Sequence, residues 1–166
     1  MSRWHLNEQT FRFHALNGFQ GGSKMSRYKQ LSDAYAVNTQ ALIVYRQEAR
    51  DALTKIRDAV RKHLGLMVAD TDIVRVVSEN GTNVFSTLAV LEHGESVNFE
   101  LVVSLGGEGG LPKSDVAIPA VISKKSSHIV LSMPGINFEV VLDSDERYQA
   151  VAESVFEAVL SRLEKF

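Results

Sequence analysis

The sequence predicts an α+β protein with a long N-terminal helix, a six-stranded antiparallel β-meander and a C-terminal helix packed on the apolar face of the sheet. Three observations indicate this. A row of mostly apolar residues recurs at alternating steps of three and four between positions 28 and 63, which is the spacing of one helix face. After Gly65 the apolar period changes to two, with short turns between runs, which is typical of antiparallel strands. Helical spacing returns over 145–165.

The composition is that of one globular domain. The chain has 166 residues, of which 45% are hydrophobic and 23% charged, and this is enough to bury a core without cross-links. It has no cysteine, no apolar run of the roughly 18 residues that a membrane span needs, and no signal-peptide pattern at its start. We therefore expect a cytoplasmic protein that makes no contact with a membrane.

Residues 1–27 are expected to form a flexible or docked N-terminal segment. The stretch NGFQGGSK is rich in residues typical of linkers. Trp4, Phe11, Phe13 and Phe19 are unusually apolar for a free tail, so docking on the body of the protein stays open. Residues 28–166 are expected to form a single α+β domain with helix 28–64, sheet 73–142 and helix 145–165.

The long helix carries a seam with the period of a coiled coil. Its members are Tyr28, Leu31, Tyr35, Asn38, Leu42, Tyr45, Ala49, Ala52, Ile56, Ala59 and His63. Two helices with such a seam pack side by side, so we expect self-association, mainly through the positions from 28 to 56. Between Ala34 and Tyr45 the helix is apolar on nearly every side, which predicts burial all round. Gly65 is a plausible stop.

Six runs of period two predict the strands: 73–79, 82–92, 95–105, 116–122, 129–133 and 136–142. Asn80–Gly81 between the first two is a strong hairpin signal. The second face of the sheet mixes valines with small polar residues, as a solvent face, a cavity lining or a subunit contact would. Before the last helix, Asp143 and Glu146 have the spacing of a capping box.

Charge is unevenly distributed along the chain. Residues 1–65 hold eleven Lys/Arg and five Asp/Glu, whereas residues 66–166 hold seven and fifteen. A basic row lies on the long helix, and three more cations stand near its start; the possible polyanion contacts are Lys24, Arg27, Lys29, Arg46, Arg50, Arg57 and Arg61. Such a group can bind phosphates in a salt-sensitive way. No nucleic-acid-binding motif accompanies it, and the acidic part of the chain could neutralise it instead.

We find no catalytic signature and expect no cofactor and no metal. The five histidines stand far apart, and no nucleophile motif is present. Glu100 and Glu139 could form an acid–base pair only if their strands were adjacent. The glycine-rich 106–114 loop matches no phosphate-binding pattern and is expected to be a long hairpin loop that could contact a ligand.

We therefore expect a non-enzymatic, cytosolic protein-interaction or adaptor module that forms a homodimer through its long helix. One alternative is nucleic-acid binding by the basic row. A second follows from the element order: a short strand possible over TFRFHAL, a helix, six strands and a helix. This order resembles in outline that of the helix-grip folds, which implies an apolar ligand held between the sheet and the C-terminal helix.

Overall fold

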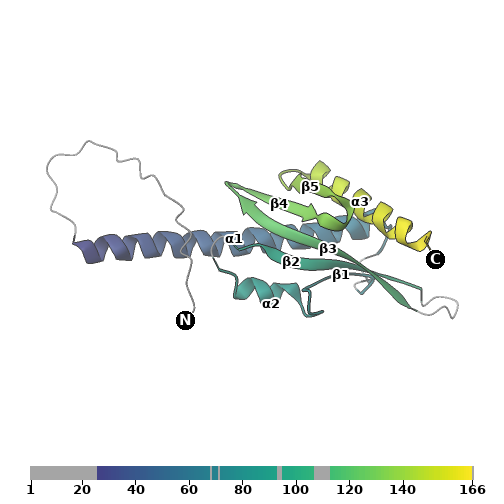
Figure 1. Ribbon diagram of the computed structural model, residues 1–166, viewed down its shortest axis with the longest axis horizontal. Helices are drawn as coiled ribbons and strands as arrows, with labels where there is room; N and C mark the ends of the chain where they lie inside the picture. Colours follow the sequence, from purple (N-terminus) through teal and green to yellow (C-terminus); the bar gives the residue numbers. More distant parts are fainter. Residues whose placement is uncertain (1–25, 68, 71, 93–94, 107–112, 166) are drawn as a thin grey trace, which may run out of the picture.

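A computed structural model of the chain describes residues 26–67, 69–70, 72–92, 95–106 and 113–165 (Figure 1). Nearly all of the 1–27 segment therefore lies outside the described residues. The elements are α1 (Arg27–His63), β1 (Val74–Val77), α2 (Val84–Ala89), β2 (Val97–Leu105), β3 (Ser114–Lys125), β4 (His128–Met133), the 3₁₀ turn η2 (Pro134–Ile136), β5 (Phe138–Val141) and α3 (Asp145–Leu163). The predicted α+β class, the long first helix and the final helix are confirmed.

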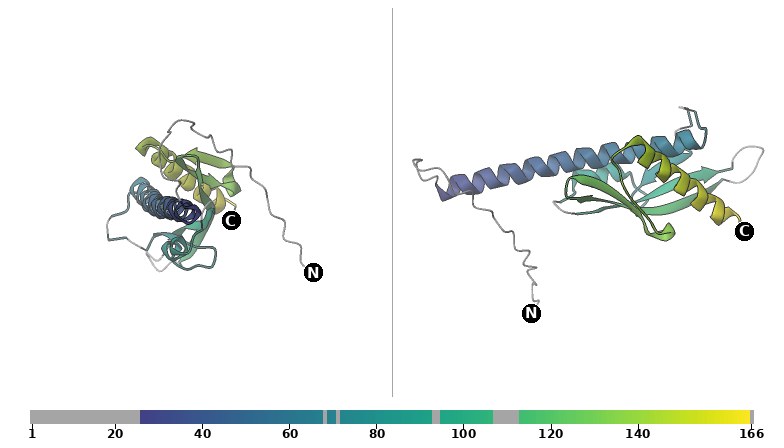
Figure 2. Two further views of the ribbon diagram at one scale, coloured as in Figure 1. Left: turned by 90° about the vertical axis from the view of Figure 1, so that its left-hand side faces the viewer. Right: turned by 90° about the horizontal axis from the view of Figure 1, so that it is seen from above.

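The five strands form one antiparallel sheet in the order β1-β2-β3-β4-β5, so each strand pairs with its neighbour in sequence. The two longest strands are joined over nine residue pairs, from Val97↔Ile122 to Leu105↔Ser114. α1 and α3 pack against each other and against one face of this sheet (Figures 1 and 2). Alternate strand residues such as Phe99, Leu101 and Leu131 point into the layer between, where they are at most 1% exposed.

The sheet has five strands where the sequence predicts six, because residues 82–92 do not form a strand. The Asn80–Gly81 turn does form: Gly81 has a φ of 73°, and its amide donates to the Ser78 carbonyl oxygen at 2.8 Å. The return strand stops at a single bridge between Val77 and Asn83. From there the Asn83 side chain accepts from the Phe85 amide and caps α2. Helical spacing then buries Val84 and Leu88, four residues apart, on one face.

The cap of α3 also lies one residue later than the capping-box spacing predicts. Ser144, not Asp143, is the N-cap residue, and its carbonyl oxygen accepts from the amides of Arg147 and Tyr148. Hydrogen bonds from the backbone amide of Glu146 and from the Ser144 hydroxyl hold the pKa of the Glu146 carboxyl below its ordinary value. The acidic residue therefore still supports the first turn, but with Ser144 as its partner.

The end of α1 confirms the role predicted for Gly65. Its φ of 70° lies in the left-handed region, and its amide donates to the Lys62 carbonyl oxygen at 3.1 Å. The next amide, of Leu66, donates to the Arg61 carbonyl oxygen at 3.0 Å. These two bonds form a Schellman motif, which satisfies the last carbonyls of the helix.

The second sheet face carries the predicted mixture of valines and polar residues. Asn98 and Glu139 are exposed, whereas Val102 is only 6% exposed. The condition set for a Glu100–Glu139 acid–base pair is not met, because β3 and β4 separate their strands. At about 4.8 Å per strand, the two carboxylates belong to strands about 14 Å apart.

Candidate self-association surface

The seam of α1 divides at Tyr45 into two halves with opposite environments. In the projecting half, residues 27–44, Tyr28, Leu31 and Tyr35 are 81%, 71% and 74% exposed. Asn38 is exposed and Leu42 is half-buried. α1 extends beyond the sheet at its purple N-terminal end (Figures 1 and 2). At 1.5 Å per residue, the projecting half is about 27 Å long.

The docked half, residues 45–63, uses the same seam to build the core of its own chain. Tyr45, Ala49, Ala52 and Ile56 are 5%, 0%, 3% and 0% exposed and belong to the main hydrophobic cluster. The Tyr45 hydroxyl donates to the Glu95 carbonyl oxygen at 3.0 Å, and burial raises the pKa of this phenol. The predicted self-association residues are therefore not one surface, since the last four are already covered.

Burial all round between Ala34 and Tyr45 is not what the single chain shows. Val37, Ile43 and Val44, which lie off the seam, are 68%, 52% and 41% exposed. This part of the helix was expected to be buried because of its composition, but the sheet ends before reaching it. The chain presents a largely apolar rod to its surroundings.

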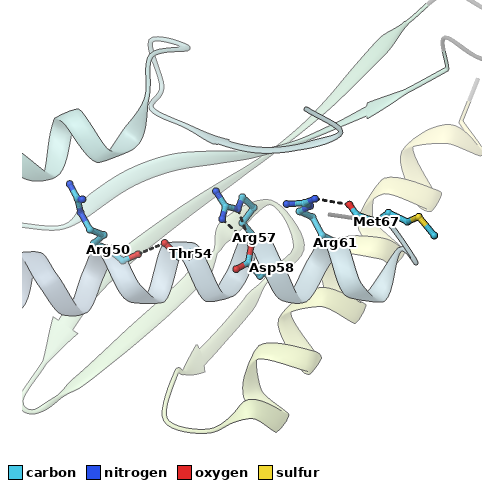
Figure 3. A network of polar contacts seen from close by, with 6 residues as sticks. All are labelled: Arg50, Thr54, Arg57, Asp58, Arg61 and Met67. Carbon is cyan, nitrogen blue, oxygen red and sulfur yellow. Dashed lines mark hydrogen bonds and ion pairs between the residues drawn. The ribbon is translucent and has the colours of Figure 1, made fainter. Parts of the chain in front are cut away.

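Most members of the basic row are engaged within the chain. Arg46 donates to the Leu91 carbonyl oxygen through both Nε, at 3.1 Å, and Nη2, at 2.5 Å. Arg61 donates to the Met67 carbonyl oxygen at 2.8 Å, and Arg57 pairs with Asp58 at 3.0 Å (Figure 3). Arg50 lies 5.6 Å from the centre of the Phe85 ring.

The other predicted polyanion contacts are near the start of α1. Arg27 and Lys29 are exposed on the projecting half, whereas Lys24 lies outside the described residues. The two exposed cations are more than 25 Å from Arg46 along the helix, at about 1.5 Å per residue. The predicted polyanion residues are therefore not gathered into one patch.

A further polar cluster joins β1, β2 and β3, where the Asp115 carboxylate accepts from Arg75 Nη2 and from the Ser104 hydroxyl, each at 2.6 Å. Among the described residues, no group of three or more His, Asp or Glu side chains could hold a metal ion. His63 is the last residue of α1, and its Nε2 lies 3.3 Å from a Glu153 carboxylate oxygen. The ring of Phe156 meets that imidazole edge-on, 5.6 Å away between centres. Residues 107–112 of the glycine-rich loop lie outside the description.

The sequence offered an apolar site between the sheet and the C-terminal helix only as an alternative without named residues, and the structure has an apolar cavity of about 280 Å³ beside the C-terminal half of α3. Helix α3, the end of β2 and the connection after α1 line it with Leu64, Leu66, Ile73, Val103, Leu105, Val155, Phe156, Val159, Leu160 and Leu163. Leu160 and Leu163 are each 44% exposed. Their position, at the edge of the apolar stripe of α3, was the available signal.

No family model, curated protein or solved structure matches this chain. No helix among the described residues is long and apolar enough to cross a bilayer.

Proposed function

We propose that this chain is a non-enzymatic, cytoplasmic interaction module that forms a homodimer through the projecting half of α1. The observation that carries the proposal is the exposure of the seam from Tyr28 to Asn38, in contrast with its burial from Tyr45 to Ala59. The engagement of Arg46, Arg57 and Arg61 within the chain favours this function over polyanion binding.

Most of the stability of a helix in a protein comes from packing of an apolar face rather than from its own hydrogen bonds. The projecting half has 18 residues, and over most of its length its seam is exposed in the single chain. A partner helix would supply the packing.

The partner we propose is a second copy, because the seam contains nothing that repels itself. Its exposed members are two tyrosines, a leucine and an asparagine, and none is charged. Asn38 is the one amide in this exposed seam, and a paired helix must supply it with a hydrogen-bond partner.

The test compares two substitutions of matched exposure. Leu31→Glu places a charge on the seam, and Val37→Glu places the same charge off the seam, where the residue is 68% rather than 71% exposed. Sedimentation equilibrium should show a dimer for the native chain, and Leu31→Glu should raise its dissociation constant by about 100-fold or more. Val37→Glu should change it by less than about threefold. A native chain that stays monomeric at high concentration, or equal effects of the two variants, would refute the proposal.

A second candidate function, binding of a small apolar ligand, is favoured by the cavity beside α3. The side chains that line this cavity are all apolar, and α3 lies over the sheet as the outline of a helix-grip fold requires. Decanoate at increasing concentration should then raise the melting temperature of the native chain. Leu160→Glu should abolish this shift, whereas Val90→Glu, at a site 75% exposed outside the cavity, should preserve it. The absence of any shift across a series of apolar ligands would exclude this function.

A further inference from the structure

Resting on the proposed dimer, we infer that the two projecting halves pair antiparallel in one defined register. Leu31 of each copy faces Leu42 of the other, and Tyr35 of each faces Asn38 of the other. The pairing is centred between Ala36 and Val37. The structure supports this orientation and this register by separate arguments.

The orientation follows from what covers the docked half. Its seam residues Ala49, Ala52 and Ile56 are 0–3% exposed because the chain's own core lies on them. In a parallel pair, the partner helix would continue along this same face and enter that core. In an antiparallel pair, each body lies beyond the end of the other helix, so both cores remain intact.

The register follows from how far the helices can overlap. With Leu31 opposite Leu42, Tyr28 of one copy reaches the level of Tyr45 of the other, where the seam becomes covered. A shift of one heptad toward greater overlap would push Tyr28 onto the level of Ala52, inside the second body. A shift the other way would leave the exposed part of Leu42 uncovered by the second copy.

The contacts in this register are chemically matched. The leucine layers pair apolar with apolar. Each Asn38 side-chain amide faces a Tyr35 phenol of the other copy. Because the phenol can both donate and accept a hydrogen bond, the amide has a hydrogen-bond partner. In the register with greater overlap, Asn38 would instead face Leu42, at the cost of an unpaired amide.

Charge complementarity supports the same register. Each heptad of the seam is counted from Tyr28. Antiparallel pairing brings together the positions that directly precede the first residue of each heptad, and these positions are Arg27, Ala34, Ala41 and Glu48. Arg27 then stands opposite Glu48 of the second copy, and symmetry repeats the pair. The Glu48 side chain is 39% exposed, and only its Oε2 is held by Lys124, at 2.6 Å, so the carboxylate can accept from a second cation.

The area available suits a specific dimer. A buried tyrosine covers about 150–250 Å², and four tyrosines, two from each copy, are each about three-quarters exposed. They alone would bury about 500–800 Å², and the four leucines add to this. The sum reaches the scale of about 1,000 Å² or more that specific interfaces need.

Spin labels measure the orientation and register directly, because the chain has no cysteine and each label can be placed alone. Three full-length variants, Asp33→Cys, Gln40→Cys and Gln47→Cys, carry the label at exposed positions that repeat every heptad on the outer side of the helix. Pulsed dipolar spectroscopy then gives the distance between the two labels of a dimer. Sedimentation of each labelled variant verifies that the dimer persists.

The inferred pairing predicts equal distances for Asp33 and Gln40, each with an axial offset of about 10 Å. For Gln47 the axial offset rises to about 32 Å, so its distance must be clearly the longest. One distance shared by all three sites would show a parallel dimer, and unequal distances for Asp33 and Gln40 would show another register. Either result overturns this inference while leaving the dimer, whereas the absence of a dimer in sedimentation overturns both.

Charge reversal tests the flanking pair independently. Arg27→Glu should raise the dissociation constant of the dimer about fivefold, because it places like charges together twice. The matched control Lys29→Glu changes the same charge two residues away, at a position that points outward from the seam, and should leave the constant within about twofold. Equal effects of the two reversals would contradict the Arg27–Glu48 pairing.

Discussion

The two halves of α1 have the same seam and opposite surroundings. After Tyr45, which is itself 5% exposed, the docked half of the seam carries mostly small or aliphatic residues, with Ala49, Ala52 and Ile56 each 0–3% exposed against the chain's own core. Over 27–44 it carries larger side chains, with Tyr28 and Tyr35 at 81% and 74% exposure. The contrast teaches that heptad spacing reports that a helix face is covered, but not whether the same chain covers it.

Side-chain size separates the halves. Alanine has no side-chain entropy to lose and allows close approach of another element, so it suits a helix pressed against its own sheet and against α3. Tyrosine offers a large apolar body with a polar tip, and it is enriched where a surface must tolerate water before it meets a partner. The first seam alanine, Ala49, follows Tyr45, which is buried at the edge of the body of the protein.

Hydrogen exchange should show the largest difference between the halves. In the Leu31→Glu variant, amides of residues 30–44 should exchange at least about 1,000-fold faster than those of 49–60. The amides of 49–60 become exposed only when the whole domain unfolds, whereas those of 30–44 become exposed by local opening of the helix. In the native chain at high concentration, dimerisation should slow exchange over 30–44 and leave 49–60 unchanged. The measurement is exchange mass spectrometry with peptides from each half. Equal protection of both halves in the variant would contradict the division at Tyr45.

Truncating a seam residue should cost stability only in the docked half. Ile56→Ala removes a side chain that is 0% exposed, and large-to-small changes in a core cost about 2–5 kcal/mol of unfolding free energy. Leu31→Ala, at 71% exposure, should change the unfolding free energy by no more than about 0.5 kcal/mol at a concentration where the chain is monomeric. Urea denaturation followed by circular dichroism gives both values. A cost above 2 kcal/mol for Leu31→Ala would mean that the projecting half folds back on its body.

The sequence predicted the parts of the fold whose signal is local. The heptad spacing predicted α1 to within one residue at each end, Gly65 predicted its stop, and the alternating pattern predicted β1, β2, β3, β4 and β5. It failed at residues 82–92, where Val84, Ser86 and Leu88 fit a strand face as well as Val84 and Leu88 fit a helix face. In the structure the Asn83 side chain caps a helix at this point. The spacing of a short apolar run cannot distinguish a helix from a strand.

The surface was harder to predict than the fold, because exposure depends on where the sheet ends. Both Leu31 and Ile56 belong to the seam, yet Leu31 is 71% exposed and Ile56 is 0% exposed. In the same way, the spacing of the arginines predicts one basic stripe on the helix. It does not predict that Arg46 and Arg61 donate to the carbonyl oxygens of Leu91 and Met67. Such partners lie 45 and 6 residues away in sequence and meet only in the folded chain.

The cations of the two halves should also differ. Arg46 is bonded twice to the Leu91 carbonyl oxygen, so Arg46→Ala should cost about 1–2 kcal/mol and loosen the connection after α2. Arg27→Ala, on the projecting half, should change the unfolding free energy of the monomer by no more than about 0.5 kcal/mol. Chemical denaturation measures both. If Arg46→Ala were neutral while polyanion binding fell, the arginine would serve a ligand rather than the fold.

The two ends of α1 offer a smaller test. Gly65→Ala forces a side chain into the left-handed region and should cost about 1 kcal/mol of global stability, since this end is part of the body. Ser26 caps the other end by accepting from the Lys29 amide at 3.2 Å, and Ser26→Ala should also cost about 1 kcal/mol. That second cost should appear only as faster exchange of the first turns, with no change in the melting temperature of the monomer. Equal shifts in melting temperature would show that the two halves unfold together.

The boundary residue Tyr45 should give the smallest effect, and one that depends on pH. Tyr45→Phe removes the hydrogen bond to the Glu95 carbonyl oxygen and should cost about 0.5–1 kcal/mol at neutral pH. Because burial raises the pKa of Tyr45 above the ordinary 10.0, the native chain holds this proton more tightly than the unfolded chain does. The contribution of the phenol is therefore complete below pH 10 and is lost as the pH rises through the higher value. The stability difference between the native chain and Tyr45→Phe should accordingly shrink above pH 10, as urea denaturation at several pH values can measure. A difference that stays constant across this range would mean that the seam at Tyr45 opens to water, and the boundary between the halves would then lie closer to Ala49.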